Sequence, residues 1–156
     1  MCAILKAYPS MCGTIYDLPC CATAARQKLI EAGVGERGEF VAGSFLDSVP
    51  CGADGLVLKS IIHNWDDPRS LSILRNCRTA LTSRGKLVLI ERLMPDMLEN
   101  NGEHRAVAFS DLNMLRGLGG RERTKQEYTE LLHASDFNLV NVHAAGRFHV
   151  IEAMLV

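Results

Sequence analysis

A histidine stands where an apolar run of the chain ends. His63 follows Ile61 and Ile62 in the segment KSIIHNWDD, residues 59–67. The carboxyl end of a buried strand is where open α/β sheets place their ligands, and an imidazole titrates near neutral pH. His63 could therefore act as a general base, or it could be an ordinary surface residue at a strand-to-helix corner.

Three charged residues also stand at the ends of predicted strands. Glu91 closes the run GKLVLIE, and a carboxylate there must find a hydrogen-bond donor or shift its pKa. One candidate donor is the imidazole of His63, at the end of the preceding strand. Asp17 could accept hydrogen bonds from a ribose diol or simply form a turn. Lys59 could be a structural lysine whose charged end reaches out of an apolar run.

These residues need a scaffold that gathers strand ends, and the chain alternates apolar runs with helix-forming segments. Asp67 and Pro68 predict one helix start, and Thr124 with Glu127 predicts a capping box at another. Strands are expected at 13–17, 38–43, 54–62 and 85–95, helices at 21–33, 66–85, 104–120 and 124–137, and a β-hairpin over 137–156. The alternation predicts an α/β fold: a mostly parallel sheet, helices on both faces and an antiparallel C-terminal hairpin.

Composition points to one globular, cytoplasmic domain over residues 1–156. The net charge is −1 without runs of like charge, so neither a nucleic-acid surface nor a polybasic membrane patch is expected. No apolar stretch is long enough for a membrane-spanning helix. The six cysteines are irregularly spaced without a CxxC pair, which favours reduced thiols. Zinc-ligand spacing is absent from the sequence, so no metal is expected.

Six segments together carry a resemblance to a known family. YPSMCGTIYDLP, GSFLDSVPCGADGLVLKSIIHNWDD, ILRNCRTAL, GKLVLIERLMP, DLNML and GGRERTKQEYTELL occur in this order. From about residue 7 onward, the chain resembles the small-molecule O-methyltransferases that use S-adenosylmethionine, a group with plant phenolic, hydroxyindole and bacterial polyketide-tailoring enzymes. The resemblance implies a Rossmann-like methyltransferase sheet. It also implies methyl transfer to a hydroxyl of a small aromatic or polyketide-like acceptor.

The same resemblance implies roles for individual residues. His63 matches the general base, while Glu91 and Glu122 match the carboxylates that orient its ring. The cofactor-binding positions implied are Asp17 for the ribose, Gly43, Ser44 and Phe45 for the adenine, and Lys59 near the methionyl or adenosyl part. The family often has Asp where this chain has Ser44. Asn64 and Met114 match positions on the acceptor side.

Two parts of the family pattern are not found in the sequence. We expect the first, central strand with its glycine-rich turn, and the N-terminal helical domain that makes the family homodimeric, to be missing. With the family strand order 3-2-1-4-5-7-6, the strands at 13–17 and 54–62 would lose their shared neighbour. They would then pair directly or leave two open edges. The alternative function is a truncated, non-catalytic remnant that at most binds cofactor weakly or acts as an interaction module.

Overall fold

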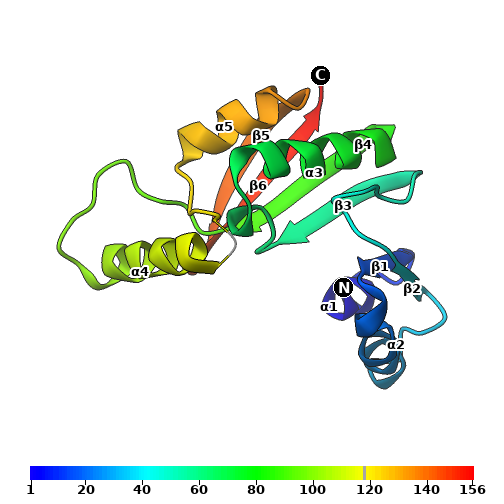
Figure 1. Ribbon diagram of the computed structural model, residues 1–156. Coiled ribbons are helices and arrows are strands. Elements are labelled where there is room, and N and C mark those ends of the chain that lie inside the picture. Colours follow the sequence, from blue (N-terminus) through cyan, green and yellow to red (C-terminus); the bar gives the residue numbers. More distant parts are fainter. Residues whose placement is uncertain (118) are drawn as a thin grey trace. The chain divides into compact units, whose positions relative to one another are not determined.

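The structure is a computed structural model that describes residues 1–117 and 119–156. It divides into two compact units, Met1–Val49 and Pro50–Val156 (Figure 1). Each unit is built around its own sheet, one of two strands and one of four. Among the described residues, no helix is long and apolar enough to cross a bilayer.

The first unit holds a two-stranded parallel sheet. Its elements are α1 (Cys2–Ala7), β1 (Gly13–Asp17), a 3-10 turn (Pro19–Cys21), α2 (Ala22–Glu31) and β2 (Gly38–Ala42). Leu5 of α1, Leu29 of α2 and Val34 form a small buried cluster. Gly33 follows α2 with φ 68°, a backbone conformation that glycine adopts without strain and that commonly ends a helix. The predicted strands and helix of this region are therefore present.

The second unit holds a four-stranded sheet in the order β3-β4-β6-β5. Its elements are β3 (Ala53–Lys59), a 3-10 turn (Ile62–Asn64), α3 (Asp67–Ala80), β4 (Leu81–Glu91), α4 (Gly102–Gly117), α5 (Lys125–His133), β5 (Phe137–Ala145) and β6 (Phe148–Leu155). Strands β3 and β4 are parallel, and β6 runs antiparallel to both β4 and β5. The predicted C-terminal hairpin is therefore confirmed.

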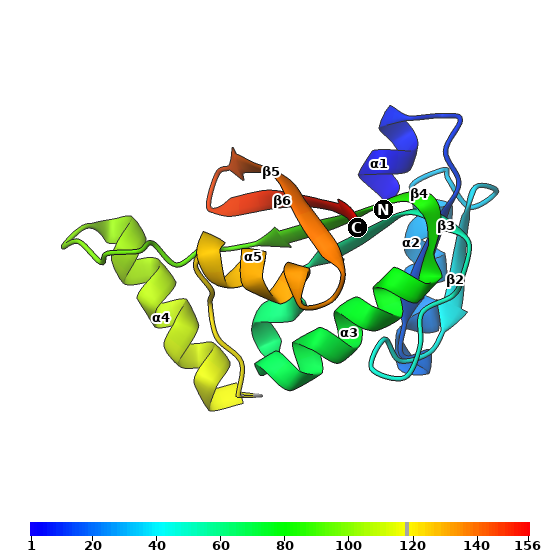
Figure 2. The same ribbon diagram turned by 90° about the horizontal axis from the view of Figure 1, so that it is seen from above.

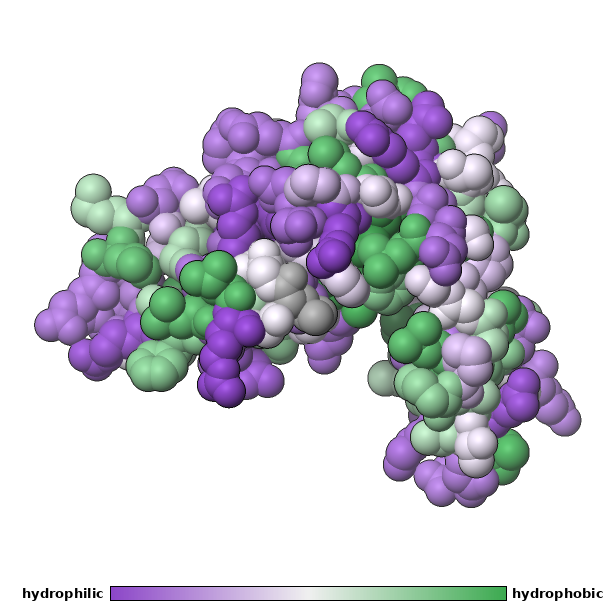
Figure 3. All heavy atoms as spheres, in the orientation of Figure 1, coloured by the Kyte–Doolittle hydropathy of each residue, from purple (hydrophilic) through white to green (hydrophobic). Residues whose placement is uncertain are grey.

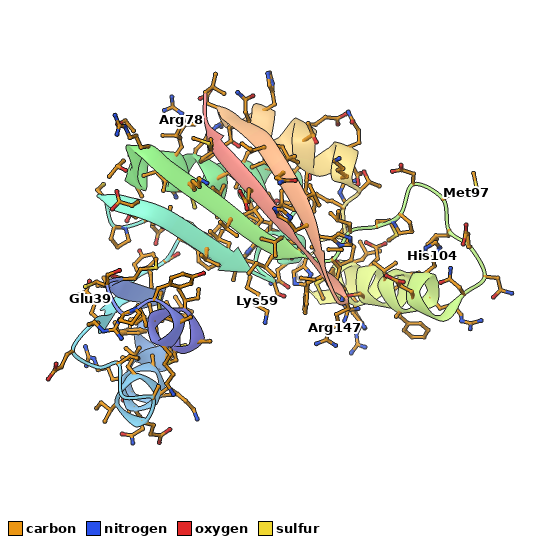
Figure 4. All side chains as sticks on the ribbon, turned by 180° about the vertical axis from the view of Figure 1, so that it is seen from behind. Glu39, Lys59, Arg78, Met97, His104 and Arg147 are labelled. Carbon is orange, nitrogen blue, oxygen red and sulfur yellow. The ribbon has the colours of Figure 1, made fainter. Side chains whose placement is uncertain are left out.

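Helices α3 and α5 pack against the same face of this sheet, as the two ribbon views and the view from behind agree (Figures 1, 2 and 4). Alternate residues of a strand point to opposite faces. On β4 the fully buried Leu87 and Leu89 face the helices, while Val57, whose partner is Val88, lies on the other face and is 50% exposed. Helix α4 carries the exposed apolar side chains Phe109, Leu112 and Leu115. In Figure 3, hydrophobic residues, drawn in green, reach the surface over this part of the molecule.

The strand order agrees with the family order once its first strand is left out. Strands β1 and β2 correspond to 2 and 3, and β3-β4-β6-β5 corresponds to 4-5-7-6. Of the two expected outcomes, direct pairing or open edges, the second is observed, because β1 and β3 belong to different sheets. The described residues therefore leave each of these strands with a single strand partner.

Several predicted boundaries are wrong by a few residues. Strand β3 ends at Lys59 rather than Ile62, because Ser60 takes a positive φ of 54° and turns the chain. Strand β4 begins at Leu81 rather than Gly85, because Leu81 pairs with Ala53, and it ends at Glu91 rather than Pro95. The predicted helix 104–120 is observed as α4, which ends at Gly117. Position 118, inside the predicted range, lies outside the described residues.

The two predicted helix starts have different outcomes. The capping box of α5 is confirmed, with both hydrogen bonds between Thr124 and Glu127 present. The N-cap of α3 is Asp66, whose Oδ1 accepts from the backbone N–H of Arg69 at 3.0 Å. The prediction of Asp67 as N-cap is therefore wrong, and its carboxylate pairs with arginines instead.

Candidate active site

His63 lies on a tight turn between β3 and α3. After Lys59, the backbone N–H of Ser60 still donates to the carbonyl of Ile90 at 3.0 Å, which keeps the chain beside β4. The turn then brings the backbone N–H groups of Ile61 and Ile62 within 3.0 and 2.9 Å of Glu91 Oε1. The carboxylate that ends β4 therefore holds the turn that presents the histidine.

Two buried carboxylates flank the imidazole. His63 Nδ1 lies 3.2 Å from Glu122 Oε1 and 3.8 Å from Glu91 Oε2. The His63 side chain is 12% exposed, and both carboxylate side chains are fully buried. With a proton on Nδ1 donated to Glu122, the lone pair of the neutral ring lies on Nε2. The three residues expected to act together are thus brought together by the fold.

Helix α4 holds Glu122 from the other side. The hydroxyl of Ser110 donates to Glu122 Oε1 at 2.6 Å, and Asp111 Oδ1 accepts from the Glu122 backbone N–H at 2.8 Å. Sequence reasoning missed both residues. A signal was present, since Asp111 begins the DLNML segment and Ser110 directly precedes it. Met114 lies one helical turn beyond Ser110 and is half-buried.

Arg123 is a fully buried cation beside the same turn. Its guanidinium donates to the backbone carbonyls of Ile62 at 3.2 Å and Trp65 at 2.8 Å. It also forms two hydrogen bonds with Asp67 Oδ1, at 3.1 and 2.7 Å. Partial burial opposes ionisation of Asp67, but the charges of Arg123 and Arg121 hold the pKa of this carboxyl below its usual range. Sequence reasoning missed Arg123, although it belongs to the GGRERT segment.

The buried environment changes the acidity of the flanking groups. Burial raises the pKa of Glu91 to about 7, and the charge of His63 and the N–H groups of Ile62 and Ile61 only partly oppose it. Burial alone would lower the pKa of His63. The hydrogen bond to Glu122 and the charges of Glu91 and Glu122 outweigh that effect and leave the pKa of His63 raised. The imidazole is therefore a stronger base than a free histidine side chain.

These shifts predict a pH dependence of folding stability. The folded chain holds the Glu91 proton more tightly than the unfolded chain, between the ordinary pKa of 4.5 and about 7. Its contribution to the unfolding free energy therefore falls as pH rises through that window. The raised pKa of His63 acts in the same direction above pH 6.5. Denaturant unfolding is expected to give a higher free energy near pH 5 than near pH 7.5. Glu91→Gln should remove most of this slope, and an equal slope in the variant would contradict the assignment.

The expected adenosyl-binding residues lie in the first unit, at the carboxyl ends of β1 and β2. The backbone N–H of Gly43 donates to the Asp17 carbonyl at 2.9 Å. Asp17 Oδ1 accepts from the backbone N–H of the next residue, Leu18, at 2.7 Å, where the chain leaves β1. Ser44 Oγ accepts from the Leu46 N–H at 3.3 Å, and Phe45 is half-buried beside it in the chain. Both roles considered for Asp17, binding a ribose diol and forming a turn, are compatible with this geometry.

Lys59 and Asn64 belong to the second unit. Lys59 Nζ lies 5.3 Å from the centroid of the Phe148 ring, which Arg92 and Arg147 also approach, at 5.9 and 5.1 Å. Figure 4 shows Lys59 and Arg147 at the same end of the sheet. Asn64 Nδ2 donates to the Ser60 carbonyl at 3.0 Å and so braces the turn of His63. Among the described residues, no cluster of three or more His, Cys, Asp or Glu side chains could hold a metal ion.

Comparison with known sequences gives a consistent set of relatives. The sequence model of the family described as "O-methyltransferase domain" matches residues 1–138. The phenazine O-methyltransferase PhzM of Lysobacter antibioticus is 41% identical over 153 residues, which are 97% of this chain and 43% of that protein. The O-demethylpuromycin-O-methyltransferase of Streptomyces alboniger is 41% identical over 154 residues, 97% of this chain and 41% of that protein. The chain thus spans about two fifths of the length of these relatives.

Solved structures agree with the sequence relatives. The crystal structure of LaPhzM has a TM-score of 0.91 at 40% identity, over 99% of this chain and 46% of that one. The O-methyltransferase NcsB1 from neocarzinostatin biosynthesis, solved with S-adenosyl-L-homocysteine and 1,4-dihydroxy-2-naphthoic acid, has a TM-score of 0.88 at 34% identity. The match covers 99% of this chain and 45% of that structure. The fold of the chain is therefore the fold of part of these proteins.

Proposed function

Because the chain belongs to the O-methyltransferase domain family, we propose that it transfers a methyl group from S-adenosylmethionine to a hydroxyl of a small aromatic or polyketide-like acceptor. The observation that supports this most strongly is the imidazole of His63, held by the buried carboxylates of Glu91 and Glu122. The naphthoic acid bound to NcsB1 supports a planar, hydroxylated acceptor. Residues 1–156 would then form one partial methyltransferase domain.

In this proposal, His63 is the general base. Its Nε2 takes the proton of the acceptor hydroxyl, and the resulting imidazolium keeps its Nδ1 proton on Glu122 Oε1. Bound S-adenosylmethionine supplies an activated, electrophilic methyl group. The protein therefore needs mainly to align the two reactants and to provide one general base. Glu91 adds negative charge beside the ring and fixes the turn that carries it. The two carboxylates together favour the charged ring that forms on proton transfer.

The remaining expected residues divide between donor and acceptor. A carboxylate at the end of a parallel strand suits a ribose diol, and Asp17 is the exposed last residue of β1. We assign Gly43, Ser44, Phe45 and Lys59 to the rest of the donor, as the resemblance implies. Asn64, beside the base, and Met114 are assigned to the acceptor. A cytoplasmic homodimer completes the proposal for the whole protein.

A second candidate is a non-catalytic remnant that binds the donor weakly or serves as an interaction module. One observation favours it. Four of the candidates for binding the donor, Asp17, Gly43, Ser44 and Phe45, lie in or directly after a two-stranded sheet that is separate from the four-stranded one. The two candidates differ in whether the donor is bound with the strength that an enzyme requires.

Calorimetric titration of the 156-residue chain with S-adenosylmethionine tests the proposal. A saturable heat is expected, because the Asp17 carboxylate can form charge-assisted hydrogen bonds with the ribose. Asp17→Asn should weaken binding by about 10- to 100-fold, the effect of one such bond. Asp47→Asn, an exposed carboxylate of the same unit, serves as the matched control and should leave binding unchanged. Absence of saturable heat would favour the remnant.

A further inference from the structure

The turn that carries His63 is held by side chains that bind both its backbone N–H groups and its backbone carbonyls. Its N–H groups, at Ile61 and Ile62, point to Glu91 Oε1. Its carbonyls, at Ile62 and Trp65, point to the guanidinium of Arg123. A three-residue 3-10 turn has few internal hydrogen bonds of its own. The orientation of the imidazole therefore depends on groups outside the turn.

The Arg123 guanidinium is itself fixed in place. Asp67 Oδ1 accepts hydrogen bonds from its Nε and one terminal nitrogen, and Ser70 Oγ lies 3.3 Å from that nitrogen. Its backbone is also tied down, since its carbonyl accepts from the Met94 N–H at 2.9 Å. A planar guanidinium held on one edge by a carboxylate presents its other N–H groups in set directions. These N–H groups reach the two carbonyls of the turn.

The segment that contains Arg123 also carries Glu122. A Cβ added at Gly120 would collide with the carbonyl oxygen of His63, so this segment and the turn touch through their backbones. Glu122 then reaches the ring, and Arg123 reaches the carbonyls on either side of His63. Two neighbouring residues thus contact the base and the backbone that carries it.

We propose that Arg123 is a positioning residue that holds the turn of His63, and with it the imidazole, against Glu122. The proposal rests on the assignment of His63 as base but adds a residue that touches neither donor nor acceptor. Without the guanidinium, the carbonyls of Ile62 and Trp65 lose their charged donor. They keep only the Trp65 N–H, 3.1 Å from the Ile62 carbonyl, and the Ser70 hydroxyl, at 3.5 and 3.3 Å from the two oxygens. The ring then moves away from Glu122, and its basicity falls toward that of a free histidine.

Arg123→Lys tests this in the full 156-residue chain. One ammonium cannot reach both carbonyls and the carboxylate in the forked geometry of a guanidinium. Proton NMR titration of the His63 ring, assigned by comparison with His63→Gln, is expected to show a midpoint lower by about one pH unit. Arg121→Lys is the matched control, because Arg121 is half exposed and pairs with Asp67 and Glu127 at the surface. Its His63 midpoint should stay within about 0.2 of the parent protein, within the range of ordinary surface changes.

An unchanged His63 midpoint in folded Arg123→Lys would overturn the proposal. If that variant does not fold, Asp67→Asn decides, since it weakens the anchor of the guanidinium and keeps the side-chain shape. A smaller fall of the midpoint then supports the proposal, and no fall overturns it. The titration needs neither donor nor acceptor, so its outcome is separate from that of the methyl-transfer assay. A shifted midpoint in an inactive chain would support the positioning role while the proposed function fails.

Discussion

Replacing His63 by Gln is expected to lower methyl-transfer turnover by about 10²- to 10⁴-fold, the usual contribution of a positioned general base. Gln is close to His in length and polarity but cannot take up a proton at neutral pH. Binding of S-adenosylmethionine should change little, because His63 is not among the residues assigned to the donor. The measurement is steady-state turnover with a saturating hydroxylated aromatic acceptor, alongside a binding titration with the donor.

The pH profile sharpens this test. A base acts in its neutral form, so turnover should rise with pH through the pKa of His63. That midpoint should lie above 6.5, because the carboxylates favour the protonated ring. His133→Gln, an exposed histidine in the last turn of α5, is the matched control and should keep the parent turnover. If His63→Gln is as active as the parent near pH 7, another group removes the hydroxyl proton.

Glu91→Ala is expected to lower the free energy of unfolding by about 2–6 kcal/mol. The carboxylate accepts from the N–H groups of Ile61 and Ile62, and its side chain is fully buried. Each buried donor left without an acceptor costs about 1–3 kcal/mol. Equilibrium unfolding in urea, followed by circular dichroism, gives the difference directly.

Glu91→Gln separates the two roles of this residue. Its amide oxygen can still accept from the turn, so the loss of stability should be much smaller than in Glu91→Ala. The negative charge beside the imidazole is gone, however, and the pKa of His63 should fall. If Gln and Ala destabilise the chain equally, the hydrogen bonds to Ile61 and Ile62 do not explain the role of Glu91.

The sequence predicted the element types well where local signals agree with tertiary packing. Thr124 and Glu127 form their capping box because both partners lie within one helical turn. The N-cap of α3 was mistaken because Asp66 and Asp67 both precede Pro68 and either could cap the helix. Arg123 and Arg121, 54 and more residues further on, draw the Asp67 carboxylate away from the helix end. Only the folded chain contains that information.

The early start of β4 has a similar cause. The predicted helix 66–85 includes Thr82 to Gly85, yet α3 ends at Ala80 and these residues belong to strand β4. Leu81 pairs with Ala53, and the Thr82 hydroxyl donates to Asp54 Oδ1 at 3.1 Å. Pairing between distant segments thus overrode local propensity.

The resemblance predicted the charged residues at the centre of the candidate site. It did not predict the residues that hold them in place. His63 and Glu91 stand out because an ionisable side chain next to an apolar run needs a partner, whereas Glu122, in the segment GGRERT, was identified through the resemblance alone. Ser110, Asp111 and Arg123 stand in surroundings that do not mark them in this way. Their importance follows from a buried hydrogen-bond network that links α4, the turn of His63 and the start of α3. The side chains that hold such a network can be identified only once the segments are placed together.

The long-range contacts of His63 also have a kinetic consequence. Glu91 lies 29 residues beyond the turn N–H that it binds, and Glu122 lies 59 residues beyond the imidazole. Closing each loop costs chain entropy before the contact can compensate for it, and non-local contacts slow folding. The turn can meet Glu91 once β3 and β4 pair across α3, whereas the hydrogen bond to Glu122 must wait for the longer loop to close. The acid–base character of His63 is therefore acquired in stages during folding, and the complete pair of carboxylates is a property of the finished chain alone.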